Sequence, residues 1–455
     1  MTKLVVVGMG YVGIPAAALF ADVDGFNVVG IQRRSERSGW KIDWLNAGKN
    51  PIGGDEPGLS ELIARVVEKG TFRVTDDFAE CKDADTILID VQTPTDDQGI
   101  PHYESLKDAS AQVGRNLKRD ALVIIESTVA PGTTEHVVKP ILEQESGMKA
   151  GKDFALAFSY ERVMVGRLLH NITQYPRIVG GIDAESTKRA MALYAKIITA
   201  GLHPTDLLTA EVAKVVENTY RDVNIAFANE MALLCESLGV DVFKVRELVN
   251  NLPNDPSNPS ANPIRNMHFP GAGVGGHCLT KDTWLLKYGV DTYGSFKVDP
   301  QVMVKSRKLN EWMPTHMAEL VEEGLRDTGV KVESAKIALL GVAFVENSDD
   351  TRNTPVKPLY EILRAKGAQP ALHDPNVREF ELPFTKVLDE AVTDADALVL
   401  VVKHKDYLNL DLVRIKRKMH TPVIVDGRNA YDKTECERLG FVYKGVGKPR
   451  QGFNG

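Results

Sequence analysis

One cysteine lies in a segment whose composition suits close approach to a ligand. Cys278 follows a glycine-dense run that includes Gly275 and Gly276, and Lys281 and Asp282 come three and four residues later. Glycine lets the backbone approach a bound group and adopt a positive φ without steric cost. A thiol beside a cation ionises more readily, and the thiolate is the nucleophilic form of cysteine. This spacing favours a nucleophilic cysteine over an inert one.

The N-terminus carries a pattern that is typical of dinucleotide binding. A continuous apolar run at Leu4–Val7, typical of a buried parallel strand, leads into a glycine turn and then an alanine-rich helix at 14–21. A second strand is predicted at Asn27–Ile31. This order is the context in which a G-x-G-x-x-G turn binds a pyrophosphate at a helix N-terminus. The turn residues are Gly8, Gly10, Tyr11, Val12 and Gly13. Together with Cys278, the pattern indicates a dehydrogenase that holds its substrate covalently.

The end of the second strand bears on the choice of cofactor. An NAD enzyme usually presents Asp or Glu there to the ribose 2′-hydroxyl, whereas this chain has Gln32, followed by Arg33 and Arg34. Glutamine keeps a hydrogen bond but does not repel a 2′-phosphate, and either arginine could pair with one. We predict NAD as the cofactor, with NADP possible and discrimination against it weak.

Composition limits the remaining classes of function. A chain of 455 residues predicts two or three domains, and a net charge of −7 gives no reason to expect nucleic acid or a membrane surface as partner. Four widely spaced cysteines predict neither a disulfide framework nor a metal site, and no apolar run is long enough to span a bilayer. The sequence is typical of a cytoplasmic protein.

Further elements place the polar segments. Strands are predicted at 86–90, 122–126, 154–158 and 177–180, and two polar loops at the strand ends should face the ligand crevice of an open parallel sheet. These loops contain Thr93 and Pro94, and Ser127 and Thr128. A long helix is expected from about Pro204 through Met231, with Lys214 and Asn218 on one face. A second helix is expected at about 299–328, a second α/β unit begins at Lys336, and the tail after Val446 is expected to fray.

These motifs, in this order, resemble the UDP-glucose/UDP-N-acetylmannosamine 6-dehydrogenase family over nearly the whole chain. They are the glycine turn, Ser127-Thr-Val, Ser159-Tyr-Glu-Arg-Val, Ala213-Lys-Val-Val-Glu-Asn-Thr-Tyr-Arg, the segment 275–282 and Asp426-Gly-Arg-Asn. The resemblance implies an α/β protein in three parts. Residues 1–203 would form a Rossmann NAD-binding domain, residues 204–328 an all-helical dimerisation domain with the cysteine loop, and residues 329–455 a Rossmann-like UDP-binding domain. The family oxidises a sugar C6 alcohol to a carboxylate in two hydride transfers.

The resemblance also implies a role for each site residue. Cys278 would trap the aldehyde as a thiohemiacetal that becomes a thioester, Lys214 and Asn218 would stabilise the oxyanion, and Asp282 would assist Lys214 and the hydrolytic water. Glu161 and Thr128 would lie near that water. Cofactor contacts are expected from the glycine turn, Gln32, Arg33, Thr93, Pro94, Ser127, Thr128 and Lys281. Substrate contacts are expected from Glu161, Arg162, Lys214, Asn218, Arg265, Gly275, Gly276, Phe344, Arg352 and Arg428. No metal is implied.

Details of these motifs are similar to the N-acetylhexosamine branch. The Glu-Arg-Val start and Gly166 agree with that branch, although Val165 replaces its proline, and Val345 replaces a lysine expected after Phe344. We therefore expect a UDP-N-acetylhexosamine 6-dehydrogenase, with UDP-N-acetylmannosamine as the favoured substrate, that supplies uronic acids for surface polysaccharide. A homodimer with shared active sites is implied, in which Arg265 reaches the substrate of the neighbouring subunit.

Several alternatives remain open on the sequence. UDP-glucose, UDP-N-acetylglucosamine or UDP-N-acetylgalactosamine could be the substrate, because the preferred epimer depends on side chains that sequence does not place. A two-electron dehydrogenase of the 3-hydroxyacid type would share the Rossmann domain and the lysine–asparagine pair, but it needs neither Cys278 nor a third domain. A non-catalytic sugar-nucleotide sensor would not need Cys278, Lys214 and Asn218 together.

Overall fold

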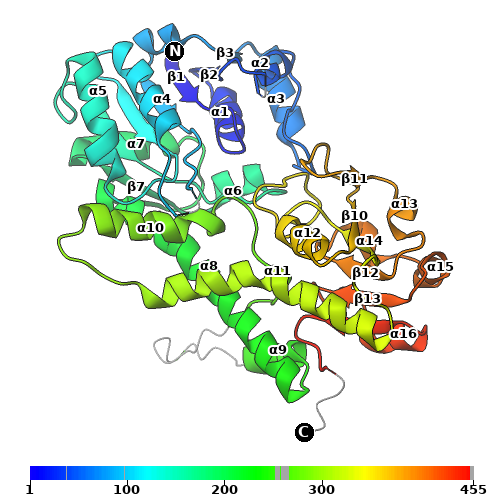
Figure 1. The fold of residues 1–455 in the computed structure, drawn as a ribbon. Coiled ribbons are helices and arrows are strands. Elements are labelled where there is room, and N and C mark those ends of the chain that lie inside the picture. Colours follow the sequence, from blue (N-terminus) through cyan, green and yellow to red (C-terminus); the bar gives the residue numbers. More distant parts are fainter. Residues whose placement is uncertain (37, 97, 252–256, 258–265, 451–455) are drawn as a thin grey trace. The chain divides into compact units, whose positions relative to one another are not determined.

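The computed structural model describes residues 1–36, 38–96, 98–251, 257 and 266–450. The chain divides into two compact units, Met1–Asn218 with Lys281–Asp299, and Thr219–Thr280 with Pro300–Gly455. Helices α8 (Leu207–Leu238) and α10 (Leu279–Tyr293) each continue from one unit into the other (Figure 1). The predicted division into three domains at residues 203 and 328 stays a prediction.

The first unit is built on an eight-stranded sheet. Its order is β3-β2-β1-β4-β5-β6-β7-β8, and neighbouring strands are parallel except for the antiparallel pair β6 and β7. The central strands are runs of buried branched residues, as expected for strands that are covered on both faces. The strands are β1 (Thr2–Val7), β2 (Phe26–Ile31), β3 (Phe72–Thr75), β4 (Thr86–Ile89), β5 (Leu122–Ile125), β6 (Ala155–Phe158), β7 (Arg177–Gly181) and β8 (Leu202–Asp206).

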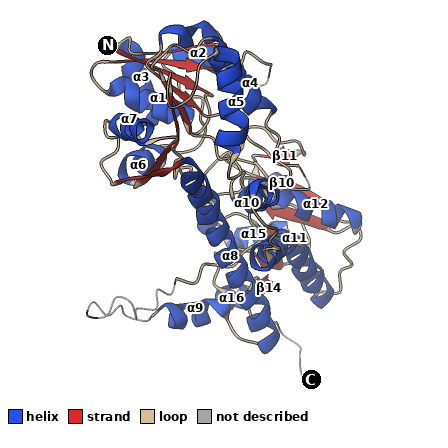
Figure 2. Cartoon of the chain, turned by 90° about the vertical axis from the view of Figure 1, so that its left-hand side faces the viewer, coloured by secondary structure: helices blue, strands red, loops and turns tan. Residues whose placement is uncertain are grey.

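Helices cover both faces of this sheet. α1 (Gly13–Asp22), α3 (Leu59–Glu68) and α7 (Ala184–Tyr194) pack on one face, and α4 (Glu104–Arg115) and α5 (Lys139–Ser146) pack on the other (Figure 2). The order of strands reverses between β1 and β4, so the ligand crevice of such a sheet lies beyond their carboxyl ends. The shorter helices are α2 (Trp40–Asn46), α6 (Leu168–Gln174), a 3₁₀ helix at Phe78–Asp83 and a π-helical turn at Thr134–Val138.

Long helices occupy the middle of the sequence. They are α8 (Leu207–Leu238), α9 (Val242–Asn250), α10 (Leu279–Tyr293) and α11 (Gln301–Asp327). The prediction that the first of them begins near Pro204 was wrong, because Leu202–Asp206 forms the edge strand β8. An edge strand tolerates a proline, which lacks the N–H group of a ladder hydrogen bond. α8 then begins at Leu207, where the Asp206 carboxylate accepts a hydrogen bond from the Thr209 N–H at 2.8 Å.

The second unit contains a six-stranded parallel sheet with the order β11-β10-β9-β12-β13-β14. α11 and α12 pack on one face, and α13, α15 and α16 pack on the other. Together the two sheets confirm the predicted α/β class. The elements are β9 (Lys336–Leu340), α12 (Val356–Ala365), β10 (Gln369–His373), β11 (Phe384–Thr385), α13 (Leu388–Val392), β12 (Ala397–Leu400), α14 (Lys405–Leu408), α15 (Leu412–Lys418), β13 (Val423–Asp426), α16 (Lys433–Arg438) and β14 (Val442–Gly445).

The C-terminal segment is held more tightly than its composition predicts. The Gly447 N–H donates to Glu236 on α8 at 2.7 Å, and the Arg450 guanidinium pairs with the same buried carboxylate at 2.9 Å. The expectation that the tail frays after Val446 was therefore wrong as far as Arg450. Among the described helices, none has the length and apolar character needed to cross a membrane.

Candidate active site

The glycine turn after β1 fits a dinucleotide for steric reasons. A Cβ atom on Gly8, whose φ is +110°, would lie 2.0 Å from the Asp90 carbonyl oxygen. A Cβ on Gly13 would lie 1.9 Å from the Gly8 carbonyl oxygen, whereas a Cβ on Gly10 would meet no described atom within 4 Å. Two glycines are thus required by packing and the third leaves open space at the start of α1. This is the cradle that a pyrophosphate needs.

The polar loops after β4 and β5 are tied to each other. The Ser127 hydroxyl accepts from the Val91 N–H and lies 2.8 Å from the Val91 carbonyl, and the Thr93 hydroxyl donates to the Thr128 carbonyl at 2.5 Å. The Pro94 carbonyl accepts from the His102 N–H at 2.8 Å. The predicted cofactor residues of these loops therefore lie together at the carboxyl edge of the sheet.

Gln32 lies where a ribose-binding residue is expected. Its Oε1 accepts from the Met9 N–H in the glycine turn at 3.2 Å, and its Nε2 donates to the Ser38 hydroxyl at 3.0 Å. Arg33 and Arg34 form exposed ion pairs with Asp108 at 2.8 Å and with Asp76 at 3.1 Å. Exposed pairs of this kind contribute little stability, so an incoming phosphate could displace them.

Two residues beside the glycine turn were missed by the sequence analysis. Lys41 Nζ donates to the Met9 carbonyl at 3.1 Å, which places a cation at the turn. Burial raises the pKa of Asp90, and the charges of Glu126 and Glu161 raise it further. A glycine pattern gives no signal for either residue, because α2 and β4 bring them to the turn from elsewhere in the chain.

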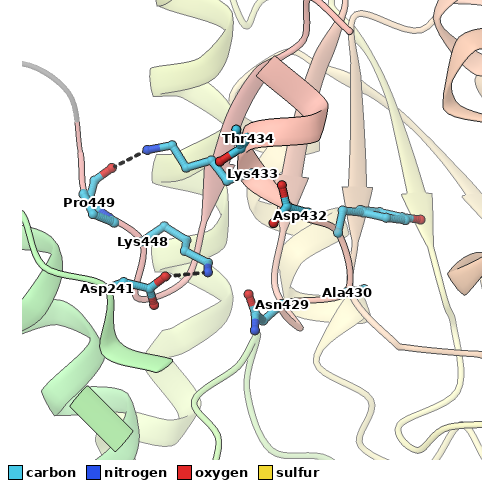
Figure 3. A pocket seen from close by; sticks show the side chains of 9 residues that line it. Asp241, Asn429, Ala430, Asp432, Lys433, Thr434, Lys448 and Pro449 are labelled. Carbon is cyan, nitrogen blue, oxygen red and sulfur yellow. Dashed lines mark hydrogen bonds and ion pairs between the residues drawn. The ribbon is translucent and has the colours of Figure 1, made fainter. Parts of the chain in front are cut away.

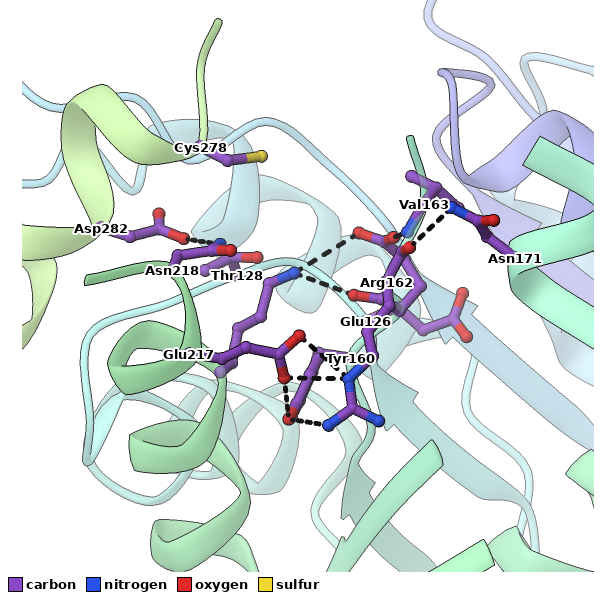
Figure 4. Close-up of polar contacts among 12 residues, drawn as sticks. Glu126, Thr128, Tyr160, Arg162, Val163, Asn171, Glu217, Asn218, Cys278 and Asp282 are labelled. Atoms are coloured by element: carbon purple, nitrogen blue, oxygen red, sulfur yellow. Dashed lines mark hydrogen bonds and ion pairs between the residues drawn. The ribbon is translucent and has the colours of Figure 1, made fainter. Parts of the chain in front are cut away.

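The predicted Lys214 and Asn218 both lie on α8, but they contact different partners. Lys214, 5% exposed, donates to the Glu161 carbonyl at 2.8 Å and lies 3.8 Å from Glu161 Oε1. Asn218 Nδ2 donates to Asp282 at 2.5 Å (Figure 4). Lys281 Nζ donates to the same buried carboxylate at 2.8 Å. The structure thus joins Asp282 to Asn218 and Lys281, and joins Lys214 to Glu161.

Arg162, a predicted substrate residue, is engaged by α8. Its Nε donates to Glu217 at 2.9 Å, and the Tyr160 hydroxyl donates to the same carboxylate at 3.1 Å (Figure 4). Lys214 Nζ also lies 5.1 Å from the centre of the Tyr160 ring. These contacts fix the segment that carries Glu161 against α8.

Glu211, a buried carboxylate on α8, holds the loop that carries Thr128. The sequence analysis did not predict this residue. The buried Glu211 side chain accepts from the Gly132 N–H at 2.6 Å and from the Thr134 N–H at 2.8 Å. Burial raises the pKa of Glu211 to about 7, although both hydrogen bonds act in the opposite direction. Because Glu211 precedes Lys214 by three residues, it fixes the loop of Thr128 relative to the turn of α8 that carries the lysine.

The cysteine loop belongs to the second unit and packs on the loop after β9. A Cβ on Gly275 would lie 2.5 Å from the Phe344 side chain, and a Cβ on Gly276, whose φ is +81°, would lie 2.9 Å from the ring of Phe344. The Gly276 N–H donates to the Arg352 carbonyl at 2.8 Å. α10 begins at Leu279, so Cys278 directly precedes a helix N-terminus, and its Sγ lies 3.6 Å from the His277 ring. This position at a helix N-terminus favours a thiolate.

The remaining predicted substrate residues follow strands of the second sheet. The Arg352 guanidinium pairs with Asp350, with Nε and Oδ1 2.8 Å apart. Arg428 Nε donates to the Val401 carbonyl at 2.8 Å, and burial lowers the pKa of this guanidinium. Phe344 follows β9 and Val401 follows β12, and the order of strands reverses between β9 and β12. Phe344, Arg352 and Arg428 therefore lie at the edge of this sheet where a ligand is expected. Arg265 lies outside the described residues.

A polar cavity of about 430 Å³ also opens on the second unit (Figure 3). Lys448 pairs there with Asp241 at 2.8 Å, and Lys433 Nζ donates to the Pro449 carbonyl at 3.4 Å. None of the predicted site residues lines this cavity; the lining residues are Asp241, Asn429, Ala430, Tyr431, Asp432, Lys433, Thr434, Lys448 and Pro449. Within the described ranges, no group of three or more His, Cys, Asp or Glu side chains is arranged to hold a metal ion.

Comparison with known proteins places this geometry among nucleotide-sugar enzymes. Domain models of the UDP-glucose/GDP-mannose dehydrogenase family match residues 2–198 as the NAD binding domain, 208–312 as the central domain and 338–433 as the UDP binding domain. The UDP-N-acetyl-D-mannosamine dehydrogenase of Pyrococcus horikoshii is 36% identical over 98% of this chain and 99% of its own length.

Two solved structures match over almost the full length. The NDP-N-acetyl-D-galactosaminuronic acid dehydrogenase from Methanosarcina mazei Go1 is 45% identical, with a TM-score of 0.85 over 99% of this chain and 96% of that one. The UDP-D-ManNAc dehydrogenase from Pyrococcus horikoshii gives 36% identity and a TM-score of 0.88 over 98% and 99% of the two chains.

Proposed function

We propose that this chain, which belongs to the UDP-glucose/GDP-mannose dehydrogenase family, oxidises the C6 hydroxyl of a UDP-N-acetylhexosamine to a carboxylate with NAD. The observation that carries the proposal is the nucleophile and its setting. Cys278 directly precedes α10, whose first turn contains Lys281 and Asp282. The Asp282 carboxylate accepts a hydrogen bond from Asn218. A two-electron dehydrogenase of the 3-hydroxyacid type would need neither this thiol nor the second parallel sheet.

The relatives favour an acetamido sugar over glucose. UDP-N-acetylmannosamine is the first candidate substrate, as the sequence motifs suggest and as the 36% identical relative is named. UDP-N-acetylgalactosamine is the second, because the relative of 45% identity is named for N-acetyl-D-galactosaminuronic acid. The two sugars differ in configuration at C2 and C4, so one active-site chemistry at C6 serves both.

NAD would be held by the glycine turn, by Gln32 and by the loops of Thr93 and Ser127, and when bound it accepts the hydride of each oxidation. In the first stage Lys214 and Asn218 would stabilise the alkoxide at C6. Once the aldehyde has formed, the Cys278 thiolate would attack its carbonyl carbon, forming a C–S bond, and the oxygen would take up a proton to give the thiohemiacetal. Oxidation of this adduct leaves a thioester.

Hydrolysis would then release the product. Glu161 and Thr128 would orient a water, and the Glu161 carboxylate would take up its proton as it attacks the thioester carbon. Lys214 and Asn218 would stabilise the resulting oxyanion until the C–S bond breaks and Cys278 leaves as thiolate. Overall, one alcohol and one water yield one carboxylate, with two cofactor molecules reduced. The hydrogen bond from Lys214 to the Glu161 carbonyl supports these roles, because it keeps the ammonium beside the proposed base.

We also propose that the active protein is a homodimer that pairs through α8, with Arg265 completing the neighbouring site. Large apolar residues at Tyr220, Phe227 and Leu234 recur every seven residues along this helix and are 69%, 51% and 52% exposed. Leu238 continues the stripe and is 77% exposed. A repeat of seven keeps side chains on one helix face, and an exposed apolar stripe of this length is typical of a helix–helix interface.

A panel of UDP-sugars tests the proposed function. Purified protein and NAD are mixed with UDP-N-acetylmannosamine, UDP-N-acetylgalactosamine, UDP-N-acetylglucosamine or UDP-glucose, and the acid is identified by mass spectrometry. We expect the highest kcat/KM for one of the first two sugars and a product 14 Da heavier, as conversion of CH2OH to COOH requires. A ketone or aldehyde as the final product, or a preference for UDP-glucose, would contradict the proposal.

A further inference from the structure

A fully buried ion pair joins α8 to α11 within the second unit. Arg307 Nη1 lies 2.6 Å from Asp222 Oδ1, and both side chains are 0% exposed. The pair is incompletely satisfied, because Arg307 Nη2 and Asp222 Oδ2 form no hydrogen bond with any described residue. Arg307 Nε faces the half-exposed Glu311 carboxylate at 3.2 Å.

Stability alone does not account for such a pair. Withdrawing two charges from water costs about as much as their attraction returns, and each unsatisfied polar group adds a further penalty. Burial raises the pKa of Asp222 even though Arg307 acts against that shift, which indicates an expensive environment for the carboxylate. Apolar side chains of similar volume would hold the two helices together at least as well.

The polar network around the pair reaches both ends of the cysteine loop. Arg307 Nη1 forms a long hydrogen bond of 3.4 Å to the carbonyl of Leu279, the residue after Cys278. At the other end, Gly271 N–H donates to Asn229 Oδ1 at 2.9 Å. Asn310 connects the two ends: it donates to Asp222 Oδ1 at 2.8 Å and accepts from Asn229 at 2.9 Å.

We infer that Arg307 is a positioning residue for Cys278, acting through the first turn of α10 and the network that brackets residues 271–279. The inference deepens the proposed function, on which it rests for the role of the thiol. With Leu279 held, the helix begins directly after Cys278, where its dipole and its free N–H groups stabilise a thiolate. Without Arg307 the first turn of α10 frays, and the Cys278 thiolate is no longer stabilised by the helix N-terminus. The other charged or titratable groups nearby in sequence are His277, Lys281 and Asp282.

Four variants separate positioning from packing. Arg307→Met removes the guanidinium but leaves Asp222 buried and unpaired, so the variant could simply unfold. The double variant Arg307→Met with Asp222→Leu removes both charges and keeps an apolar contact between the helices. Arg307→Lys retains the charge with fewer donors. Lys308→Met, at an exposed position next in sequence, is the matched control.

The readout is alkylation of Cys278 by iodoacetamide, followed by peptide mass spectrometry from pH 6 to 10. Cys81, Cys235 and Cys436 are buried and should react slowly. We expect the wild-type midpoint to lie below ~8.5, the usual pKa of a thiol. In the folded double variant it should move up by about one unit, slowing alkylation at pH 7 roughly tenfold. Arg307→Lys should be intermediate and Lys308→Met unchanged.

A folded double variant with the wild-type alkylation profile would overturn the inference and leave the pair a packing feature. If the double variant does not fold, an unchanged profile in Arg307→Lys would overturn it equally. Alkylation does not depend on turnover, so the two proposals can fail separately. A protein that oxidises no UDP-sugar but still shows the shift would refute the function and leave the positioning role of Arg307 intact.

Discussion

Replacing Asp282 with asparagine should be among the most destabilising single changes in the first unit. Asp282 is 0% exposed and accepts hydrogen bonds from Lys281 Nζ at 2.8 Å and from Asn218 at 2.5 Å. Asparagine keeps the size of the side chain but removes its charge, so the buried Lys281 ammonium loses its counter-ion. Breaking a buried ion pair from one side costs about 3–5 kcal/mol.

The same helix supplies a matched control. Lys287 and Asp291 form an ion pair on α10, with side chains that are 37% and 43% exposed. An exposed i,i+4 pair contributes only about 0.3–0.5 kcal/mol. Asp291→Asn therefore makes the same chemical change on the same helix where solvent can compensate for it.

Calorimetry measures the difference between the two variants. For a unit of about 240 residues, 1 kcal/mol shifts Tm by about 2–4 °C, so Asp282→Asn should lower the transition of the first unit by about 10 °C and Asp291→Asn by no more than about 2 °C. At a temperature where both variants are folded, kcat should fall in Asp282→Asn alone, because the single amide oxygen of asparagine cannot accept from both Asn218 and Lys281, so the orientation of the Asn218 amide is lost. Equal shifts for the two variants would refute the reasoning that Lys281 and Asp282 form a buried electrostatic unit.

Three further changes test other parts of the structure. Gln32→Asp should raise the NAD/NADP ratio of kcat/KM at least tenfold, because a carboxylate repels a 2′-phosphate; a strong native preference for NAD would contradict weak discrimination. Burial raises the pKa of Glu211 from 4.5 to about 7, so the protonated form of Glu211 stabilises the folded state by about 3 kcal/mol relative to the ionised form. This stabilisation is fully present below pH ~4.5 and is lost as the pH rises to about 7. Glu211→Gln should flatten that part of the Tm–pH curve, and an unchanged slope would rule out this group as its source. Phe227→Glu should shift the protein towards monomer in sedimentation, whereas Leu408→Glu, at an exposed apolar position away from α8, should not.

The main architecture could be predicted because parallel strands buried on both faces have a characteristic sequence. Leu4–Val7 and Lys336–Leu340 are continuous apolar or mixed runs that enter glycine turns, and both proved to be central strands. β8 was missed because Leu202–Asp206 is largely exposed and polar, with a proline that suggested the start of a helix. Only its pairing with β7, which sequence does not display, makes it a strand.

The contacts within the site were harder to predict from the sequence than the fold was. Lys214 and Glu161 are 53 residues apart, and the link between them depends on how α8 packs against the sheet. Glu211 and Arg307 were not predicted as site residues, although each lies on the buried side of its helix. A usable signal was present, because Glu211 is spaced four residues from both Leu207 and Val215, which are buried. A charge within an apolar stripe is a candidate for a buried, paired role.

The stoichiometry of the complete reaction tests the central claim, that Cys278 carries the substrate through two oxidations. NADH is counted by absorbance against UDP-uronate counted by mass spectrometry, for the wild type and for Cys278→Ser. We predict two NADH per acid for the wild type. Cys278→Ser should be folded, bind NAD normally and form the acid at less than about a thousandth of the wild-type rate, because serine is a far weaker nucleophile at neutral pH. One NADH per product, or acid formation by Cys278→Ser at a rate near that of the wild type, would contradict the covalent mechanism.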